Sequence, residues 1–148
     1  MDVKPVNVHE IIDEIVSSQL FIAKRKGVAV KQDIPKDEII MADTNALQLV
    51  VRNLISNSIK FTNQGDEIEV IVKPNAHTTQ IIIKDTGIGI PKEAADKIFD
   101  SKSWTRHGTN NEKGSGFGLS LSKEFVERMG GTIWFESEDG EGSTFYNL

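Results

Sequence analysis

Two asparagines and a lysine stand at helical spacing in the stretch "RNLISNSIKFT", residues 52–62. Asn53, Asn57 and Lys60 are four and three positions apart, so that on a helix they form one stripe of the surface. Asparagine is a mediocre helix former because its amide competes with the backbone for hydrogen bonds. The stripe is therefore either an ordinary solvated face or the lining of a cleft, where amide oxygens bind Mg²⁺ and the lysine meets phosphates.

The stretch "DTGIGIP", residues 85–91, offers a carboxylate and two glycines. Asp85 ends a strand-like run, and Gly87 and Gly89 follow it at a spacing of two. A turn between a strand and a helix accounts for one glycine, since glycine adopts positive φ angles at little cost. The other interpretation is a ligand site, in which a flat ligand lies close to the backbone and the carboxylate accepts a hydrogen bond from it. The exocyclic amine of adenine is such a donor.

A cluster of glycines in "KGSGFGLS", residues 113–120, leads directly into a predicted helix. With Gly114, Gly116 and Gly118 at its start, the helix can offer free backbone N–H groups, and such groups bind anions. The spacing fits neither the P-loop nor the dinucleotide-binding fingerprint. A run without periodicity, residues 100–116, precedes the helix, and loops of that length are usually functional or disordered. We therefore expect a lid here, whose end folds over phosphates.

The last polar stretch is "GEGSTF", residues 140–145. An ordinary hairpin turn is the simpler interpretation, because glycines commonly stand in such turns. The alternative is that the hydroxyl of Ser143 or Thr144 reaches a base in the same ligand site.

These four stretches lie on or between elements that the hydrophobic pattern predicts. Helical periodicity indicates helices near residues 9–27, 44–61, 91–99 and 117–131. Strand-like patterns occur near residues 5–10, 28–35, 38–43, 66–74 and 78–85, and twice more within residues 132–148, around a turn at Asp139–Gly140. We expect an α+β fold, a two-layer α/β sandwich in which about three helices cover one face of a mixed, mostly antiparallel sheet.

The composition limits the class of protein. A chain of 148 residues that is 38% hydrophobic suffices for one core, so we expect a single domain over residues 1–148. The net charge of −5, without a basic block, argues against a nucleic-acid partner. Without cysteine the chain has neither disulfides nor thiolate metal sites, and its three histidines lack metal-ligand spacing. No apolar run reaches the roughly 20 residues of a membrane span, which suits a cytoplasmic domain.

The order of the motifs resembles the ATP-binding catalytic domain of sensor histidine kinases. A helix with N-x-x-x-N-x-x-K-F is followed by D-x-G-x-G, a lidlike loop, G-x-G-x-G-L at a helix start and a late G-x-G-S-T-F. Gyrase-type topoisomerases, mismatch-repair ATPases and heat-shock chaperones share this superfamily. The resemblance covers nearly the whole chain, from "VNVHEIIDEI" to "STFYNL". It implies a bacterial two-component signalling protein that binds ATP with Mg²⁺ in a cleft between helices and lid.

The resemblance also implies roles for individual residues. Asn57 would be the main Mg²⁺ ligand with Asn53 beside it, and Lys60 would lie near the phosphates. Asp85 would accept the adenine amine, assisted through water by Thr144. The remaining nucleotide contacts that the resemblance implies come from Gly87 and Gly89 at the base and sugar, and from Lys113, Gly114, Gly116, Gly118 and Leu119 at the phosphates.

One residue separates kinases from hydrolases in this superfamily. The hydrolytic members resemble one another in carrying a glutamate, the general base for water, where this chain has Asn53. A neutral amide does not take a proton from water at pH 7, so an ATPase or serine-kinase relative is disfavoured. The resemblance thus implies transfer of the γ-phosphoryl group to a histidine.

The acceptor histidine of such kinases lies on a separate dimerising helical hairpin, in an H-E-x-x-T-P context that this chain lacks. His9 is followed by Glu10 but by no Thr-Pro pair. We therefore expect a fragment that binds ATP or ADP, does not autophosphorylate alone and can be a monomer. Its partners in the parent protein, membrane-anchored or not, would be the hairpin domain and, indirectly, a response regulator.

One segment departs from the family pattern. A phenylalanine box commonly ends in Pro-Phe, but "IFDSKSW" keeps Phe99 and continues with Ser101, Lys102, Ser103 and Trp104. The change bears on how the lid docks, and it leaves a second hypothesis open: a degenerate nucleotide-binding or docking module without transfer activity. The lid cations that are candidates for a contact with the γ-phosphate are Lys102, Arg106 and Lys113.

Overall fold

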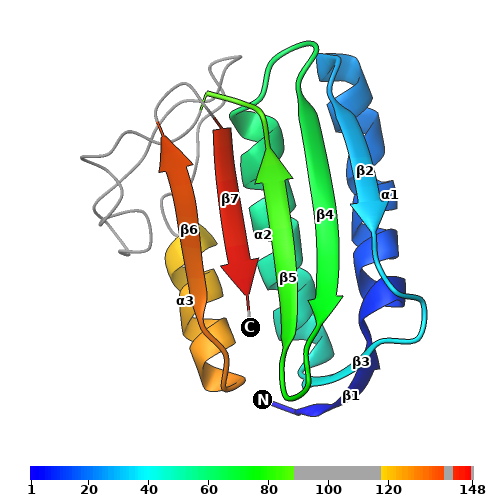
Figure 1. Cartoon of the computed structure of the whole chain (residues 1–148), viewed down its shortest axis with the longest axis vertical. Coiled ribbons are helices and arrows are strands. Elements are labelled where there is room, and N and C mark those ends of the chain that lie inside the picture. The colour runs from blue at the N-terminus through cyan, green and yellow to red at the C-terminus, as the bar shows by residue number, and fades with distance from the viewer. Residues whose placement is uncertain (89–117, 139–141, 148) are drawn as a thin grey trace.

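The structure, a computed structural model, describes the backbone of residues 1–88, 118–138 and 142–147 (Figure 1). The elements in these ranges are β1 (Lys4–Asn7), α1 (Val8–Lys26), β2 (Ala29–Asp33), β3 (Ile39–Ala42), α2 (Thr44–Lys60), β4 (Glu67–Pro74), β5 (Thr79–Asp85), α3 (Gly118–Arg128), β6 (Ile133–Glu138) and β7 (Gly142–Asn147). The predicted helix over residues 91–99 and the predicted lid over residues 100–116 lie outside the described residues.

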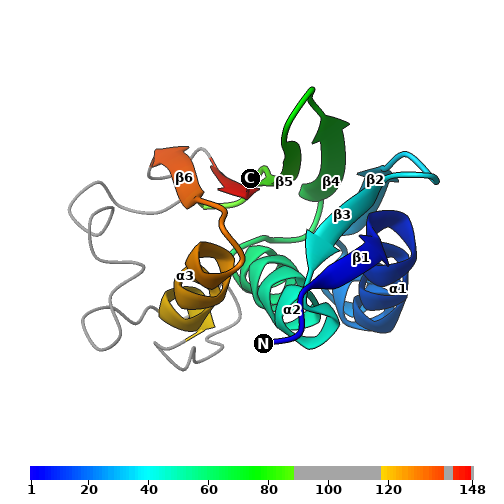
Figure 2. The same ribbon diagram turned by 90° about the horizontal axis from the view of Figure 1, so that it is seen from below.

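Five strands form the main sheet in the order β2-β4-β5-β7-β6. β2 and β4 run parallel, with Ala29 opposite Glu67, and the other neighbouring pairs are antiparallel. The described helices α1, α2 and α3 all cover the same face of this sheet, as the view from below shows (Figure 2). The prediction of a two-layer sandwich with a mixed, mostly antiparallel sheet is confirmed.

β1 and β3 form a separate antiparallel pair, in which Pro5 lies opposite Met41. The strand predicted over residues 5–10 ends earlier than expected because Asn7 caps α1. The side-chain oxygen of Asn7 accepts a hydrogen bond from the N–H of Glu10 at 3.0 Å, which commits the following residues to the helix. This pair lies at the end of the sandwich where α2 begins (Figure 2).

The core lies between the sheet and the helices. α2 buries a continuous apolar stripe, and β4 and β5 contribute buried aliphatic side chains to the same core. The core residues of these three elements are Leu47, Val50, Val51, Leu54, Ile55, Ile59, Ile68, Val70, Val72, Ile81 and Ile83. Packing of the apolar stripe fixes the rotation of α2 about its axis, so the adjoining polar stripe faces one defined direction.

Candidate functional site

α2 carries the three predicted polar residues beside its buried apolar stripe. Asn53, Asn57 and Lys60 are each half-buried, whereas Arg52 and Ser56 on the outer face of the helix are exposed. Residues beside the buried stripe of an amphipathic helix are half-buried in either interpretation, so burial alone does not separate a solvated face from a cleft lining.

Asn53 links α2 to α3. Its side-chain N–H donates to the hydroxyl of Ser122 at 3.3 Å, and Ser122 is completely buried. Leu119, one turn earlier on α3, is also buried. The helix that begins at Gly118 thus packs beside the polar stripe of α2, as the two motifs require if they share a site. The sequence pattern does not single out Ser122, because a serine on a helix carries no sign of its partner.

The side-chain nitrogen of Asn57 is buried and has no hydrogen-bond partner among the described residues. An unpaired buried amide costs about 1–3 kcal/mol, so such groups are rare unless a ligand completes their bonding. An asparagine side chain presents one oxygen acceptor and one nitrogen donor from the same carbon. The oxygen suits a hard cation such as Mg²⁺ and the nitrogen suits a phosphate oxygen, so Asn57 fits a metal–phosphate group.

Lys60 brings a positive charge to the same end of α2. Its ammonium lies 5.0 Å from the centre of the Phe61 ring, a cation–π contact, and Phe61 is only 2% exposed. The last turn of α2 thus combines an amide and a cation, which are the groups expected to face a phosphate.

Asp85 is a buried carboxylate at the end of β5. It is 5% exposed, and its Oδ1 accepts the N–H of Gly87 at 2.9 Å. A buried carboxylate is retained only where donors surround it. The predicted role of Asp85, accepting an amine of a ligand, is compatible with this placement.

Gly87 joins the Asp85 turn to the end of α2. A Cβ atom at Gly87 would lie 2.1 Å from the carbonyl oxygen of Phe61, which accepts the N–H of Ile88 at 2.9 Å. Contact between two parts of the chain therefore requires a glycine here, in addition to any need of a ligand. The same contact brings Asp85 and the last turn of α2 to one end of the molecule.

A residue that the sequence pattern did not single out reaches this region from α1. The ammonium of Lys26 donates to the carbonyl oxygens of Ile59 and Lys60, at 2.7 and 2.9 Å. The last carbonyls of a helix have no intrahelical partner, so Lys26 caps α2 from outside. The basic neighbours of Lys26, Lys24 and Arg25, are exposed. In the sequence, nothing distinguishes the three.

The structure places the other predicted site residues only in part. Thr144 on β7 pairs with Lys84 on the neighbouring strand β5, so its backbone lies beside the end of β5. The side chain of Thr144 is not among the described ones. The predicted residues beyond the described ranges are Gly89, Lys113, Gly114 and Gly116, together with Phe99 and the lid cations. Within the described ranges, no group of three or more His, Asp or Glu side chains is placed to hold a metal ion, and none of the helices has the length and apolar character to cross a membrane.

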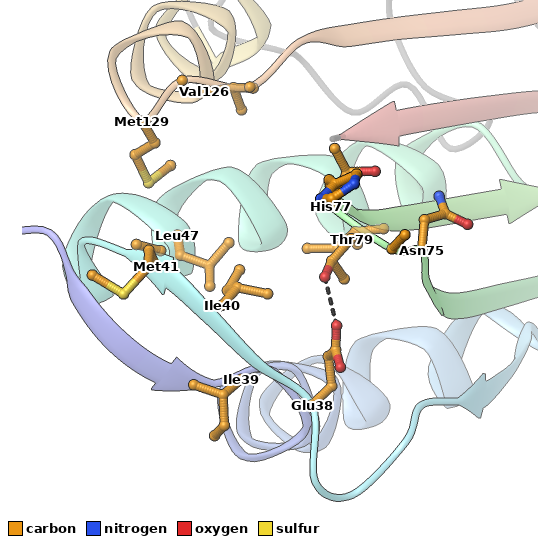
Figure 3. A pocket seen from close by; sticks show the side chains of 16 residues that line it. Glu38, Ile39, Ile40, Met41, Leu47, Asn75, His77, Thr79, Val126 and Met129 are labelled. Carbon is orange, nitrogen blue, oxygen red and sulfur yellow. Dashed lines mark hydrogen bonds between the residues drawn. The ribbon is translucent and has the colours of Figure 1, made fainter.

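A pocket of about 440 Å³, drawn in Figure 3, lies beside Thr79, at the end of β5 away from Asp85. β3, the β4–β5 turn and the end of α3 line it, and the hydroxyl of Thr79 donates to the carboxylate of Glu38 at 2.5 Å beside it. Thr79 begins β5 and Asp85 ends it. The pocket is therefore separate from the region around Asp85 and Asn57.

Comparisons with known proteins identify the family of the chain. Residues 42–147 match the family described as histidine kinase-, DNA gyrase B-, and HSP90-like ATPase. The chain is 38% identical over 123 residues to the adaptive-response sensory kinase SasA of Prochlorococcus marinus, covering 82% of this chain and 32% of that protein. It is 32% identical over 149 residues to the aerobic respiration control sensor protein ArcB of Escherichia coli, covering 98% of this chain and 19% of that protein. The chain thus spans about a third or less of these relatives.

Solved structures share the fold. The catalytic domain of histidine kinase ThkA gives a TM-score of 0.87 at 25% identity, over 99% of this chain and 94% of that one. Full-length ShkA in complex with AMPPNP gives a TM-score of 0.82 at 22% identity, over 99% of this chain and 30% of that one. The likeness extends over nearly the whole chain, so the sandwich is shared as a unit.

Proposed function

Because this chain belongs to the histidine kinase-, DNA gyrase B-, and HSP90-like ATPase family, and its relatives include sensor kinases, we propose that it binds Mg·ATP beside the last turns of α2. In its parent protein it would pass the γ-phosphoryl group to a histidine on a separate helical hairpin. The observation that carries the proposal is the buried, unpartnered side-chain nitrogen of Asn57 at the same end of the molecule as the buried carboxylate of Asp85.

Each polar group at this end has a distinct part in the proposal. Asp85 accepts the adenine amine, with Thr144 assisting through water. Asn57 and Asn53 present amide oxygens to Mg²⁺, which neutralises phosphate charge when it is bound. Lys60 adds a second positive charge close to the phosphates as a point charge on a flexible stem.

The transfer asks for positioning and charge neutralisation more than for covalent help. The bond between the γ-phosphorus and the oxygen it shares with the β-phosphate breaks, a bond to the acceptor imidazole nitrogen forms, and ADP leaves. Hydrolysis would instead need a base to take a proton from water. The side chain of Asn53 is a neutral amide whose nitrogen already bonds to Ser122, so we expect hydrolysis to be slow.

Calorimetric titration with ADP and ATP, with and without Mg²⁺, tests the proposed binding. We expect saturable binding that Mg²⁺ strengthens and that Asp85→Asn abolishes, since the neutral amide loses the charged acceptor. Asp37→Asn is the matched control, because Asp37 is exposed in the segment before β3 and should bind as the unaltered chain does. If millimolar nucleotide produces no heat and no shift in melting temperature, the proposal is contradicted.

The altered phenylalanine box supports an alternative, a degenerate nucleotide-binding or docking module without transfer activity. Adding the acceptor hairpin of the parent kinase in trans separates the two functions. A competent catalytic domain labels the hairpin from γ-labelled ATP, whereas a docking module binds it and leaves it unlabelled.

A further inference from the structure

We propose that Lys26 is a positioning residue of the nucleotide site, although it lies on α1, outside the motifs of that site. Its ammonium holds the C-terminal end of α2 and, through Phe61, the turn that carries Asp85. The expected effect on nucleotide binding rests on the proposed function. The hydrogen bonds made by Lys26 are contacts within the protein and do not depend on a nucleotide.

The first step is the end of α2. Helix C-termini carry unpaired carbonyls and a partial negative charge, both of which a cation satisfies. Lys26 donates to the carbonyls of Ile59 and Lys60 at 2.7 and 2.9 Å, and the hydroxyl of Thr62 also donates to Ile59, at 2.9 Å. Hydrogen bonds from a charged donor are stronger than neutral ones. The last turn of α2, which carries Lys60, is thus fastened from α1.

The second step leads from α2 to Asp85. The N–H of Phe61 donates to the carbonyl of Asn57 at 3.2 Å, and the carbonyl of Phe61 accepts the N–H of Ile88 at 2.9 Å. The N–H of Gly87 in turn donates to Asp85 at 2.9 Å. A short series of hydrogen bonds therefore connects the helix end held by Lys26 to the backbone of Asn57 and to the carboxylate of Asp85.

The position of Lys26 is itself fixed by the turn that follows it. Gly27 adopts a left-handed conformation with φ of 78°, and its carbonyl accepts the N–H of Gly65 at 2.9 Å. A Cβ atom at Gly27 would lie 2.7 Å from the side chain of Gln64. The end of α1 therefore packs directly on the segment that follows α2, which explains why Lys26 and not Lys24 reaches the carbonyls.

Amide hydrogen exchange in Lys26→Met tests the structural part of the inference. Without the ammonium we expect the last turn of α2 to open more often, so the Ile88 amide should exchange faster relative to Ile82 and Ile83 in the central strand β5. Lys24→Met, two residues earlier on α1 and exposed, should leave the exchange of all three amides unchanged, and Lys26→Arg should restore slow exchange of the Ile88 amide. If all three amides speed up by one common factor, or none changes, Lys26 does not hold this joint and the inference fails.

Titration with Mg·ADP tests the functional part below the melting temperature of every variant. We expect Lys26→Met to weaken binding about tenfold, the loss of one charge-assisted contact, and Lys24→Met to leave it unchanged. Faster Ile88 exchange with unaltered affinity would overturn the positioning role. If the unaltered chain itself binds no nucleotide, the proposed function fails, while the exchange result still decides whether Lys26 holds α2. Should Lys26→Met not fold, Lys26→Gln keeps most of the stem without the charge and serves in both experiments.

Discussion

The side-chain nitrogen of Asn57 and the carboxylate of Asp85 are buried polar groups, and burying each of them costs free energy. Unpaired or desolvated polar groups destabilise a folded chain, and an apolar residue of similar size usually packs better in such a place. Proteins retain such groups where a ligand makes use of them, so local rules of stability fail most often at functional sites. On this argument, an apolar residue in place of Asn57 would raise the free energy of unfolding and weaken the binding of nucleotide.

Replacing Asn57 by leucine should therefore stabilise the chain and remove its response to Mg²⁺. We expect Asn57→Leu to raise the free energy of unfolding in urea by about 1 kcal/mol, because the buried nitrogen no longer lacks a partner. Nucleotide affinity should become independent of Mg²⁺. Ser58→Ala is the control: its hydroxyl is also buried and unpaired, so it should gain stability without a change in binding. A destabilised Asn57→Leu would show that the amide packs well without a ligand.

At the scale of elements, local patterns predict what each segment becomes but not which partner it meets. The apolar stripe of α2 and the position of Asp85 at a strand end follow from periodicity and sequence position, and the structure contains both. The separation of β3 from the main sheet does not follow from the sequence pattern, because apolar and polar residues alternate in a strand in the same way whichever sheet it joins. Lys26 and Ser122 escaped prediction for the same reason, since their partners lie on other helices.

Asp43, the N-cap residue of α2, makes the stability of the folded chain depend on pH. The backbone N–H groups of Ala46 and, next, Asp2 donate to the Asp43 carboxylate and lower its pKa below the ordinary value of 3.8. A lowered pKa in the folded state contributes stability that is present above the unfolded pKa and is lost as the pH falls through the folded pKa.

We therefore expect Asp43→Asn to melt at a lower temperature than the unaltered chain at pH 7. The difference between the two melting temperatures should become smaller as the pH falls below 3.8, where the carboxyl becomes protonated. Melting curves of both proteins across this range provide the measurement, with the exposed Asp37→Asn as control. A gap that stays constant into acid would mean that the charge of Asp43 has no part in the cap.

For the molecule as a whole, the sandwich has two distinct ends. Asn57, Asp85 and Lys26 gather at one end, and the start of α1, the β1–β3 pair and the pocket beside Glu38 lie at the other. His9 is the second residue of α1 and Lys26 its last. At 1.5 Å per residue they are about 25 Å apart along the helix.

That separation bears on self-labelling. Transfer of the γ-phosphoryl group requires the acceptor nitrogen in contact with the nucleotide, and His9 lies at the other end of α1 from the proposed nucleotide site. We expect the isolated chain to acquire no acid-labile label from γ-labelled ATP, even when it binds the nucleotide. His9→Ala is the control, and a label on the unaltered chain that this variant lacks would show transfer between copies.

The parallel pairing of β2 with β4 also orders the events of folding. β4 and β5 form a hairpin through a short turn, and such hairpins form in about 1–10 μs. β2 finds its place only after the chain between Ala29 and Glu67, with all of α2, has folded back. Lys26 lies just before β2 in the chain, so we expect its hydrogen bonds to the end of α2 to form late in folding. Nucleotide binding should then appear in the slowest phase of refolding. Stopped-flow mixing with a fluorescent nucleotide measures this, and binding in an earlier phase would contradict the expected order.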